Sequence, residues 1–306
     1  MSATRALHDA LAKLLTEQRN PATMDLDSLS VEGILRLINA QDKLVPAAVE
    51  REIPYIVEAV DLIVHALNNG GRLIYAGAGT SGRLGVVDAA ECPPTFGTDP
   101  GLVRGIIAGG EAAMFRSQEG AEDNTDDARA VVDALVITPR DVVCGIAASR
   151  RTPFVVAAVA RARALGAKTI YLTTNPRAEF DLEVDVAICP EVGPEALMGS
   201  TRMKSGTAQK LVLNMLTTSA MVKLGKVYEN MMVDLQLTNA KLVERSKRII
   251  MMATGVSYER AAEFLELSEG HVKTAIVMAA AGVPAAEARQ RIKRAGGMVR
   301  GAIALQ

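Results

Sequence analysis

Two stretches of the chain carry carboxylates whose surroundings suit proton transfer. Glu91 comes just before paired prolines at 93 and 94, which we expect to end the helix that carries it. The helix dipole disfavours a carboxylate at that end, which favours the protonated form that a general acid needs. The second stretch, residues 118–124, offers three candidate bases: Glu119, Glu122 and Asp123. Residue chemistry alone does not choose among them.

A glycine- and hydroxyl-rich loop at residues 77–83 has the outline of a phosphate cradle. It reads Gly-Ala-Gly-Thr-Ser-Gly-Arg ahead of an expected helix. Glycines let the backbone approach an anion, and hydroxyls and a helix amino terminus supply donors. The residues suited to these roles are Gly79, Thr80, Ser81 and Gly82. The acidic partner of a dinucleotide fingerprint and the Gly-Lys-Ser/Thr of a P-loop are both missing, so neither a dinucleotide nor ATP is expected.

A second loop, residues 147–153, places Ser149 and Thr152 at the start of another expected helix. Ordinary capping by Ser or Thr explains either loop taken alone. Because the two loops follow adjacent strands of the expected sheet, however, one phosphate could bridge both helix termini. The pair of loops therefore favours a phosphate site.

Short apolar runs alternating with helical segments place these loops on a parallel sheet wrapped in helices. The expected strands cover residues 72–76, 102–108, 141–147, 168–173 and 184–189. The expected helices around them cover residues 56–67, 126–135, 152–165 and 203–224. The predicted fold class is α/β, a doubly wound, five-stranded parallel sheet.

The flanks of this sheet are expected to be helical. Residues 1–50 show helical spacing of apolar side chains (Leu7, Leu11 and Leu14, then Ile34, Leu35 and Ile38), and the polar residues 16–21 between them are expected to form a loop. Beyond Gly225 the β signal ends, and the Ala-rich tail predicts a small helical bundle. We predict an N-terminal helical segment of 1–50, a sheet domain of 51–225 and a C-terminal helical domain of 226–306.

Composition excludes several classes of function. A net charge of −1 gives no overall attraction for nucleic acid or an anionic membrane, and 49% hydrophobic residues suffice for a packed core. The three cysteines lack C-x-x-C spacing, and the three histidines are dispersed, so neither a disulfide framework nor a metal site is expected. Charges interrupt the first residues and polar groups interrupt 211–224, so neither a secretory signal nor a membrane span is expected. A reducing, cytoplasmic location fits these features.

The paired hydroxyl loops resemble the sugar isomerase (SIS) fold, a flavodoxin-like architecture whose members hold hexose 6-phosphates with such hydroxyls. The match covers about residues 50–225, which makes 51–225 a phosphosugar-binding domain. The turn Ser-Thr-Arg-Met-Lys before the long helix fits it too. The resemblance adds Ser200, Thr201 and Lys204 to the expected phosphate-binding residues.

The chain most closely resembles the N-acetylmuramic acid 6-phosphate etherases of cell-wall recycling, nearly from end to end. The segments that carry the resemblance are residues 16–21, 77–96, 119–123 and 199–210, with the helical tail. The resemblance implies that Glu91 protonates the departing lactate and that Glu122 is the base at C2. At one position the chain departs from the family, because Arg150 stands where glycine is usual. Arg150 could add a cation to the phosphate site or point outward.

The activity that the resemblance implies is elimination of D-lactate followed by addition of water, giving N-acetylglucosamine 6-phosphate. It needs no cofactor and no metal, and it implies a homodimer with the site near the interface. Two alternatives stay open. A sugar-phosphate sensor would bind a partner protein and would not need two acid–base carboxylates, and an aldose–ketose isomerase would use a carboxylate base near C2.

Overall fold

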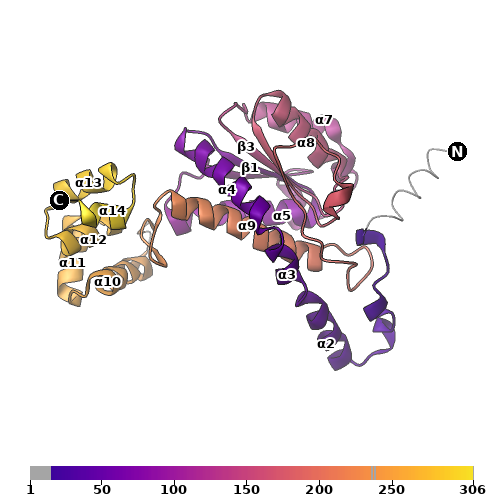
Figure 1. Ribbon diagram of the computed structural model, residues 1–306, viewed down its shortest axis with the longest axis horizontal. Helices are drawn as coiled ribbons and strands as arrows, with labels where there is room; N and C mark the ends of the chain where they lie inside the picture. The colour runs from indigo at the N-terminus through magenta and orange to yellow at the C-terminus, as the bar shows by residue number, and fades with distance from the viewer. Residues whose placement is uncertain (1–14, 236, 238, 306) are drawn as a thin grey trace. The chain divides into compact units, whose positions relative to one another are not determined.

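The computed structural model describes residues 15–235, 237 and 239–305 of the chain (Figure 1). The expected helical spacing of Leu7, Leu11 and Leu14 lies outside the described residues. The chain divides into two compact units. One comprises the residues up to Ala89 together with Gly101–Leu216, and the other comprises Ala90–Pro100 and the residues from Thr217 onward. The three-part division into 1–50, 51–225 and 226–306 stays a prediction.

The first unit is built on the predicted five-stranded parallel sheet, which the structure confirms. Its strands are β1 (Leu73–Gly77), β2 (Val103–Ile107), β3 (Val142–Ile146), β4 (Lys168–Leu172) and β5 (Val186–Ile188), in the order β2-β1-β3-β4-β5. All the pairings are parallel. Every residue of β1 and β3 is buried, as central strands covered on both faces require. This strand order is the flavodoxin-like one.

Helices cover both faces of the sheet (Figure 1). One face carries α7 (Thr125–Ala134) and α8 (Pro153–Ala164), whose apolar side chains share a buried cluster with Ile74 and Val143 of the sheet. The other face carries α4 (Ile53–Asn68), α5 (Gly79–Phe96) and α9 (Lys204–Lys223). Because side chains alternate along a strand, Tyr75 points to this second face, where its hydroxyl donates to Asp88 of α5 at 3.0 Å.

The predicted end of α5 at the paired prolines is wrong. The helix continues through Pro93 and Pro94 to Phe96, and the N–H of Gly97 then donates to the carbonyl of Pro93 at 2.9 Å. Glu91 therefore lies more than one turn before the helix end, and the dipole acts mainly on the last turn. The helix dipole therefore does not favour a protonated Glu91, and the assignment of Glu91 as the acid rests on the family resemblance.

Short helices precede the sheet. The expected loop at residues 16–21 contains parts of two 3₁₀ turns, Leu15–Glu17 and Pro21–Thr23, and a third turn covers Leu26–Ser28. They are followed by α2 (Val31–Asp42) and α3 (Val45–Glu50). The α2 helix is amphipathic, yet it has no buried residue, so its apolar face has no cover within one copy of the described chain.

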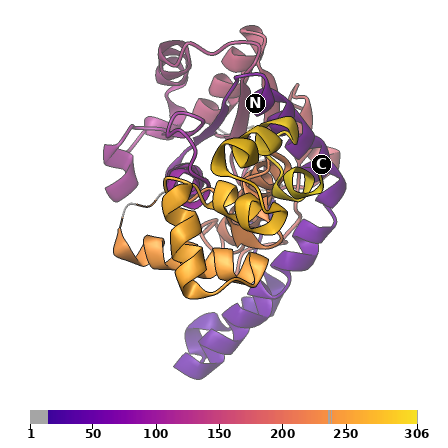
Figure 2. The ribbon, with the colours of Figure 1, turned by 90° about the vertical axis from the view of Figure 1, so that its left-hand side faces the viewer.

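The second unit contains the predicted C-terminal bundle (Figure 2). Its helices are α10 (Ala240–Thr254), α11 (Tyr258–Leu267), α12 (Val272–Ala281), α13 (Ala285–Arg294) and α14 (Val299–Ala304). Side chains from all five helices share one core, in which the first seven residues of α12 are buried. The expectation that β structure ends at Gly225 is wrong, because β6 (Val227–Tyr228) and β7 (Met231–Met232) form a short hairpin.

A buried ion cluster fixes the segment between this hairpin and the bundle. Asp234 lies 2.8 Å from the Lys273 ammonium and 3.0 Å from that of Lys226, and His271 lies 3.7 Å from its other oxygen. Burial alone would raise the pKa of Asp234. The hydrogen bonds from His271 and Lys273, with the charges of Lys273 and Lys226, instead lower that pKa to about 2.

We expect Asp234→Asn to destabilise the folded chain at pH 7. A carboxyl whose folded pKa is lowered from 3.8 to about 2 contributes stability that is complete above pH 4. That contribution, about 2 kcal/mol, is lost as the pH falls from 4 toward 2. Urea unfolding at several pH values should show a gap between wild type and variant that closes below pH 4. A gap that is the same at pH 7 and pH 2.5 would contradict this account.

Candidate active site

The carboxyl ends of β1 and β3 form the switch point of the sheet, because the chain leaves them toward opposite sides. The first loop, residues 77–83, follows β1, and the second loop, residues 147–153, follows β3. The β1 and β3 strands pair in register from Leu73 with Val142 to Gly77 with Ile146. The structure thus places both predicted loops on neighbouring strands at the edge where such sheets bind ligands.

Two glycines allow the tight turn of the first loop. A Cβ atom on Gly77 would lie 2.5 Å from the backbone nitrogen of Gly82, and one on Gly82 would lie 2.6 Å from Ile107. Gly79 has a φ of +53°, and apart from its chain neighbours and the backbone of its own helix no described heavy atom lies within 4 Å of where its Cβ would be. The helix α5 starts at Gly79, so its first amides lie in this open turn.

The first loop and the carboxylate stretch line one pocket. The pocket has a volume of about 370 Å³, and its walls come from the first loop, the end of β2 and the segment that follows β2. The lining residues are Ala78, Gly79, Arg83, Ala108, Ala113, Ser117, Gln118, Glu119, Gly120, Ala121 and Glu122. Two segments that the sequence singled out for different chemistry are therefore neighbours.

Two of the three candidate bases line this pocket. Glu122 lies in the 3₁₀ turn Ala121–Asp123, which follows Gly120 with a φ of +70°. Glu119 lines the pocket beside it, whereas Asp123 is not among the lining residues. Both glutamates are exposed, so a carboxylate here meets solvent or substrate.

Arg83 also lines this pocket, although the sequence did not single it out as a candidate site residue. Its Nε donates to the carbonyl of Met114 at 3.0 Å, which fixes the guanidinium against the segment after β2. The signal that could have found it is its place in the first loop, since a cation next to a phosphate cradle is a common pairing. The pocket therefore combines carboxylates with one guanidinium.

In the second loop Thr152 is the N-cap residue of α8, but its side chain makes no capping hydrogen bond. The hydroxyl of Ser149 accepts the N–H of Arg151 at 3.5 Å, at the limit of a hydrogen bond. The Thr152 hydroxyl is therefore not used to cap α8.

Arg150 does not point outward. Its residue is only 6% exposed, one of its Nη atoms lies 3.4 Å from Asp181, and its carbonyl accepts the hydroxyl of Tyr171 at 3.0 Å. Its φ of +64° is in the left-handed region that favours glycine. The glycine that the family resemblance implies at this position would adopt this backbone conformation without strain. The Arg150 side chain contacts Asp181, in the chain beyond β4.

The start of α9 is held by a carboxylate rather than by its hydroxyls. Glu195 is completely buried, and its two oxygens accept the backbone N–H groups of Lys204 and Ser205 at 2.9 Å each. Both oxygens are thus engaged by helix amides, so Glu195 is not placed to act as a base. An acidic residue just ahead of a helix amino terminus suits this capping role.

The Lys204 side chain is buried in the same region. Its ammonium donates to the Oε1 of Gln41 at 3.1 Å, and Asn20 donates to that same oxygen at 2.8 Å. Burial lowers the pKa of Lys204, while the charges of Glu195 and Asp42 oppose that change. Lys204 thus contacts the N-terminal segment, while Ser200 and Thr201 lie partly exposed in the turn before it.

Glu91 lies outside the lining of this pocket. It is exposed, and it belongs to the part of α5 that is counted with the second unit, Ala90–Pro100. Within the first unit, the structure therefore brings together the first loop and the two glutamates Glu119 and Glu122.

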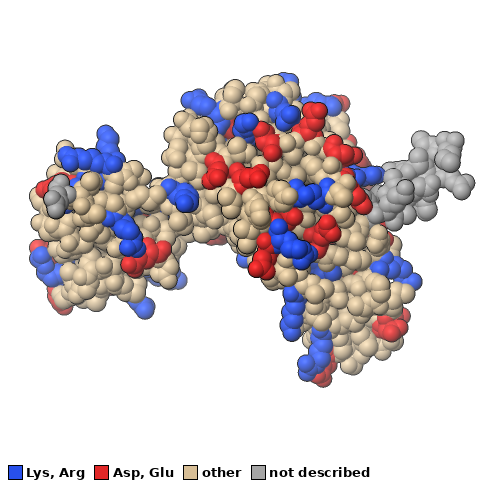
Figure 3. Space-filling model, viewed as in Figure 1, with Lys and Arg blue, Asp and Glu red and all other residues tan. Residues whose placement is uncertain are grey.

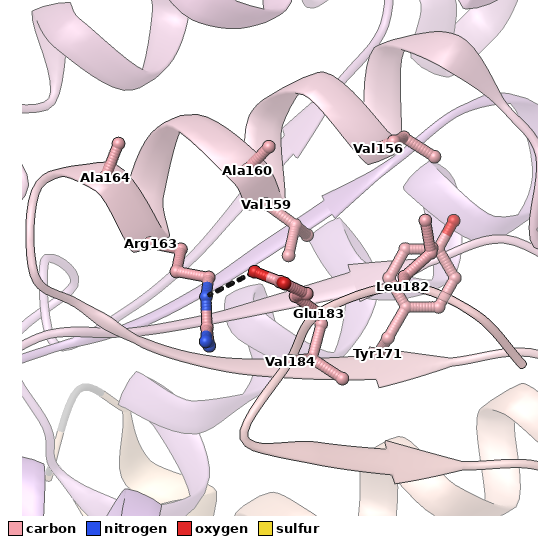
Figure 4. A pocket seen from close by; sticks show the side chains of 9 residues that line it. All are labelled: Val156, Val159, Ala160, Arg163, Ala164, Tyr171, Leu182, Glu183 and Val184. Atoms are coloured by element: carbon pink, nitrogen blue, oxygen red, sulfur yellow. Dashed lines mark ion pairs between the residues drawn. The ribbon is translucent and has the colours of Figure 1, made fainter.

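A second hollow, of about 450 Å³, lies between α8 and the chain after β4 (Figure 4). Its walls are mostly apolar, with Val156, Val159 and Leu182 among them. Its charged side chains, Arg163 and Glu183, lie 3.8 Å apart as an ion pair. Because these two charges face each other, this hollow offers no carboxylate pair for acid–base chemistry and is the weaker candidate.

Comparison with known proteins identifies the family. The chain is 60% identical over 304 residues to an N-acetylmuramic acid 6-phosphate etherase from Salinibacter ruber, covering 99% of this chain and 98% of that protein. It is 52% identical over 299 residues to one from Brucella anthropi, covering 98% and 97%. The chain belongs to the N-acetylmuramic acid 6-phosphate etherase family. The resemblance predicted from the motifs is thereby confirmed.

Family models place the SIS fold within this etherase-family chain. Residues 55–163 match the glucokinase regulatory protein N-terminal SIS domain, and residues 123–219 match the SIS domain. The predicted SIS fold is confirmed. A solved structure of a putative phosphosugar isomerase from Bacteroides fragilis aligns with 65% of this chain and 94% of its own, at 21% identity and a TM-score of 0.48.

No group of three or more His, Cys, Asp and Glu side chains is arranged to hold a metal ion within the described ranges. Among the helices that the structure describes, none is long and apolar enough to cross a bilayer.

Proposed function

We propose that this chain cleaves the D-lactyl ether of N-acetylmuramic acid 6-phosphate and gives N-acetylglucosamine 6-phosphate and D-lactate. The observation that carries the proposal is full-length identity of 52–60% to proteins named for this substrate. The pocket supports it, because it sets two glutamates beside a glycine- and hydroxyl-rich loop suited to a phosphate. The enzyme is a carbon–oxygen lyase.

The proposed reaction starts from the open-chain sugar, whose aldehyde acidifies the proton on C2. Glu122 removes that proton, and the C3–O bond to lactate then breaks. Glu91 protonates the departing ether oxygen, so no bare alkoxide has to leave. Water adds to C3 of the unsaturated aldehyde while a proton returns to C2, which restores a saturated sugar. The reaction as a whole is not a redox change, so it needs no redox cofactor.

We assign the phosphate to the open turn of the first loop, with further contacts from the second loop and from residues 200–204. The proposed contacts are Gly79, Thr80, Ser81 and Gly82 from the first loop, Ser149 and Thr152 from the second, and Ser200, Thr201 and Lys204 from the start of α9. Support is strongest for the first loop, whose helix begins at Gly79. For Lys204 the assignment requires its ammonium to leave Gln41.

We further propose that the chain works as a homodimer. The α2 helix has no buried residue, and Val31, Leu35 and Leu44 in and beside it are 73%, 61% and 53% exposed. Apolar side chains on one face of an amphipathic helix are normally covered, and a second copy is the partner that the family resemblance implies.

We also propose that the chain acts in the cytoplasm, in cell-wall recycling. The three cysteines, Cys92, Cys144 and Cys189, are buried thiols rather than disulfide sulfurs. Burial raises the pKa of Cys189 to about 11, so it keeps its proton at neutral pH. Basic and acidic side chains are interspersed on the face drawn in Figure 3, which suits a small-molecule substrate better than nucleic acid or a membrane.

The test of the proposed function is release of D-lactate from N-acetylmuramic acid 6-phosphate by the purified full chain, followed with a D-lactate-specific assay. Formation of N-acetylglucosamine 6-phosphate in equal amount is the expected result. A ketose phosphate without lactate would identify an isomerase. Sugar-phosphate binding without turnover, together with a co-purifying protein, would identify a sensor.

A further inference from the structure

A buried hydrogen-bond donor behind the first loop has no partner among the described residues. The amide of Gln209, in the second turn of α9, is 1% exposed. Its Oε1 accepts the hydroxyl of Ser81 at 3.0 Å, whereas its Nε2 is buried without a hydrogen bond. Buried donors are nearly always satisfied, so this one requires an explanation.

The side of α9 that carries Gln209 packs against the first loop. A Cβ atom on Gly206 would lie 3.5 Å from the methyl group of Thr80, and residues 206 and 209 share one side of the helix. Ser81 is 8% exposed and Gln209 is 1% exposed, so the amide lies deeper than the hydroxyl that it contacts. Because Nε2 is bonded to the same carbon as Oε1, the unpaired donor also lies next to Ser81.

The amide can present either of its two polar atoms to Ser81. Its oxygen and nitrogen have nearly the same shape, so turning the amide over exchanges them without moving the helix. With Oε1 toward Ser81, the only hydroxyl hydrogen of the serine is used by the amide. With Nε2 toward Ser81, the amide donates, the serine oxygen accepts, and the serine hydrogen becomes available to an anion.

We propose that Gln209 is a positioning residue for the phosphate of the substrate. When phosphate occupies the first loop, the amide donates from Nε2 to the Ser81 oxygen, and Ser81 donates its hydrogen to a phosphate oxygen. The buried donor then has a partner, and the serine points toward the anion. This inference rests on the proposed phosphate site, although it does not depend on ether cleavage.

The test is a double-mutant cycle of Gln209→Met and Ser81→Ala, with inorganic phosphate and N-acetylglucosamine 6-phosphate as probes in calorimetric titrations. Ser81→Ala loses the hydrogen bond to the charged phosphate itself, and Gln209→Met loses the amide that orients that hydroxyl, so each variant should bind both probes about tenfold more weakly. The double variant should bind no more weakly than Ser81→Ala alone, because Gln209 acts through Ser81. In turnover, KM should rise about tenfold while kcat stays within about twofold.

Thr207→Val is the matched control, since Thr207 is an exposed residue of the same helix turn and should leave phosphate affinity unchanged. Thermal unfolding checks that each variant folds, and Gln209→Leu replaces the Met variant if that one does not. Unchanged phosphate affinity in Gln209→Met would overturn the proposal. An equal further loss in the Ser81→Ala background would also overturn it, because that pattern marks a merely structural role.

The same experiments separate this inference from the proposed function. Wild-type protein that binds both probes but releases no D-lactate would sink the etherase assignment and leave the role of Gln209 standing. If the wild-type protein releases D-lactate but Gln209→Met has an unchanged KM, the etherase assignment stands and the proposed role of Gln209 is wrong.

Discussion

Glu122→Gln is expected to abolish proton removal at C2 and to lower kcat by about 10²–10⁴-fold, the usual contribution of a positioned base. Glutamine has nearly the size of glutamate but cannot take up a proton. The substrate should still bind, because Glu122 is an exposed pocket residue separate from the hydroxyls of the first loop. KM should therefore change little, which places the loss in the chemical step.

Glu119→Gln is the matched control for that experiment, because Glu119 lines the same pocket and carries the same charge. The direct measurement is exchange of the C2 hydrogen for deuterium in D₂O, followed by NMR. Exchange should vanish in Glu122→Gln and persist in Glu119→Gln. The opposite pattern would transfer the role of base to Glu119, and full exchange in both variants would exclude both residues.

Glu91→Gln is expected to lower D-lactate release by a similar factor, about 10²–10⁴-fold, but to leave C2 exchange active. The two effects separate because the base acts before the C3–O bond breaks, whereas the acid acts on the departing oxygen. The variant should therefore exchange deuterium into recovered substrate while it releases almost no lactate. A substrate analogue whose leaving group is more acidic than lactate should recover part of the rate.

Loss of both exchange and lactate release in Glu91→Gln would contradict a role limited to the departing oxygen. Unfolding is the simplest alternative cause of such a double loss. The control is thermal unfolding, and because Glu91 is exposed on α5 we expect the transition to move little. A variant with unchanged lactate release would remove Glu91 from the mechanism.

Much of the fold was predictable because its signals are local. Each predicted strand begins and ends within two residues of the observed one, since short apolar runs bounded by polar residues mark buried strands clearly. The paired prolines misled the prediction of α5, because two adjacent prolines remove only two amide donors and the rest of the helix can hold its path. The two-residue strands of the hairpin after Gly225 are too short to give a periodic signal.

The candidate site likewise has some features with a local sequence signal and others without one. Glycines, hydroxyls and carboxylates indicate their chemistry by residue type, so the first loop and the carboxylate stretch 118–124 could be singled out from the sequence, whereas the choice of Glu122 within that stretch came from the family resemblance. The partners that hold them could not, because Gln209 contacts Ser81 across a separation of 128 residues and Gln41 contacts Lys204 across 163. Long-range pairs of this kind leave no spacing that a single sequence can show.

The second unit consists of two separate segments of the chain, which limits the fragments in which it can be produced. Ala90–Pro100 belongs with the C-terminal helices, and a Cβ atom on Gly97 would lie only 2.1 Å from the carbonyl oxygen of Asp234. A fragment that begins at residue 226 lacks that segment, and a fragment that ends at residue 225 keeps it without residues 226–306 of the same unit. A fragment that ends at residue 216 contains the whole first unit, whereas no single cleavage releases the whole second unit, because Ala90–Pro100 lies within the sequence span of the first. The C-terminal helices therefore cannot be expressed alone with all of their packing.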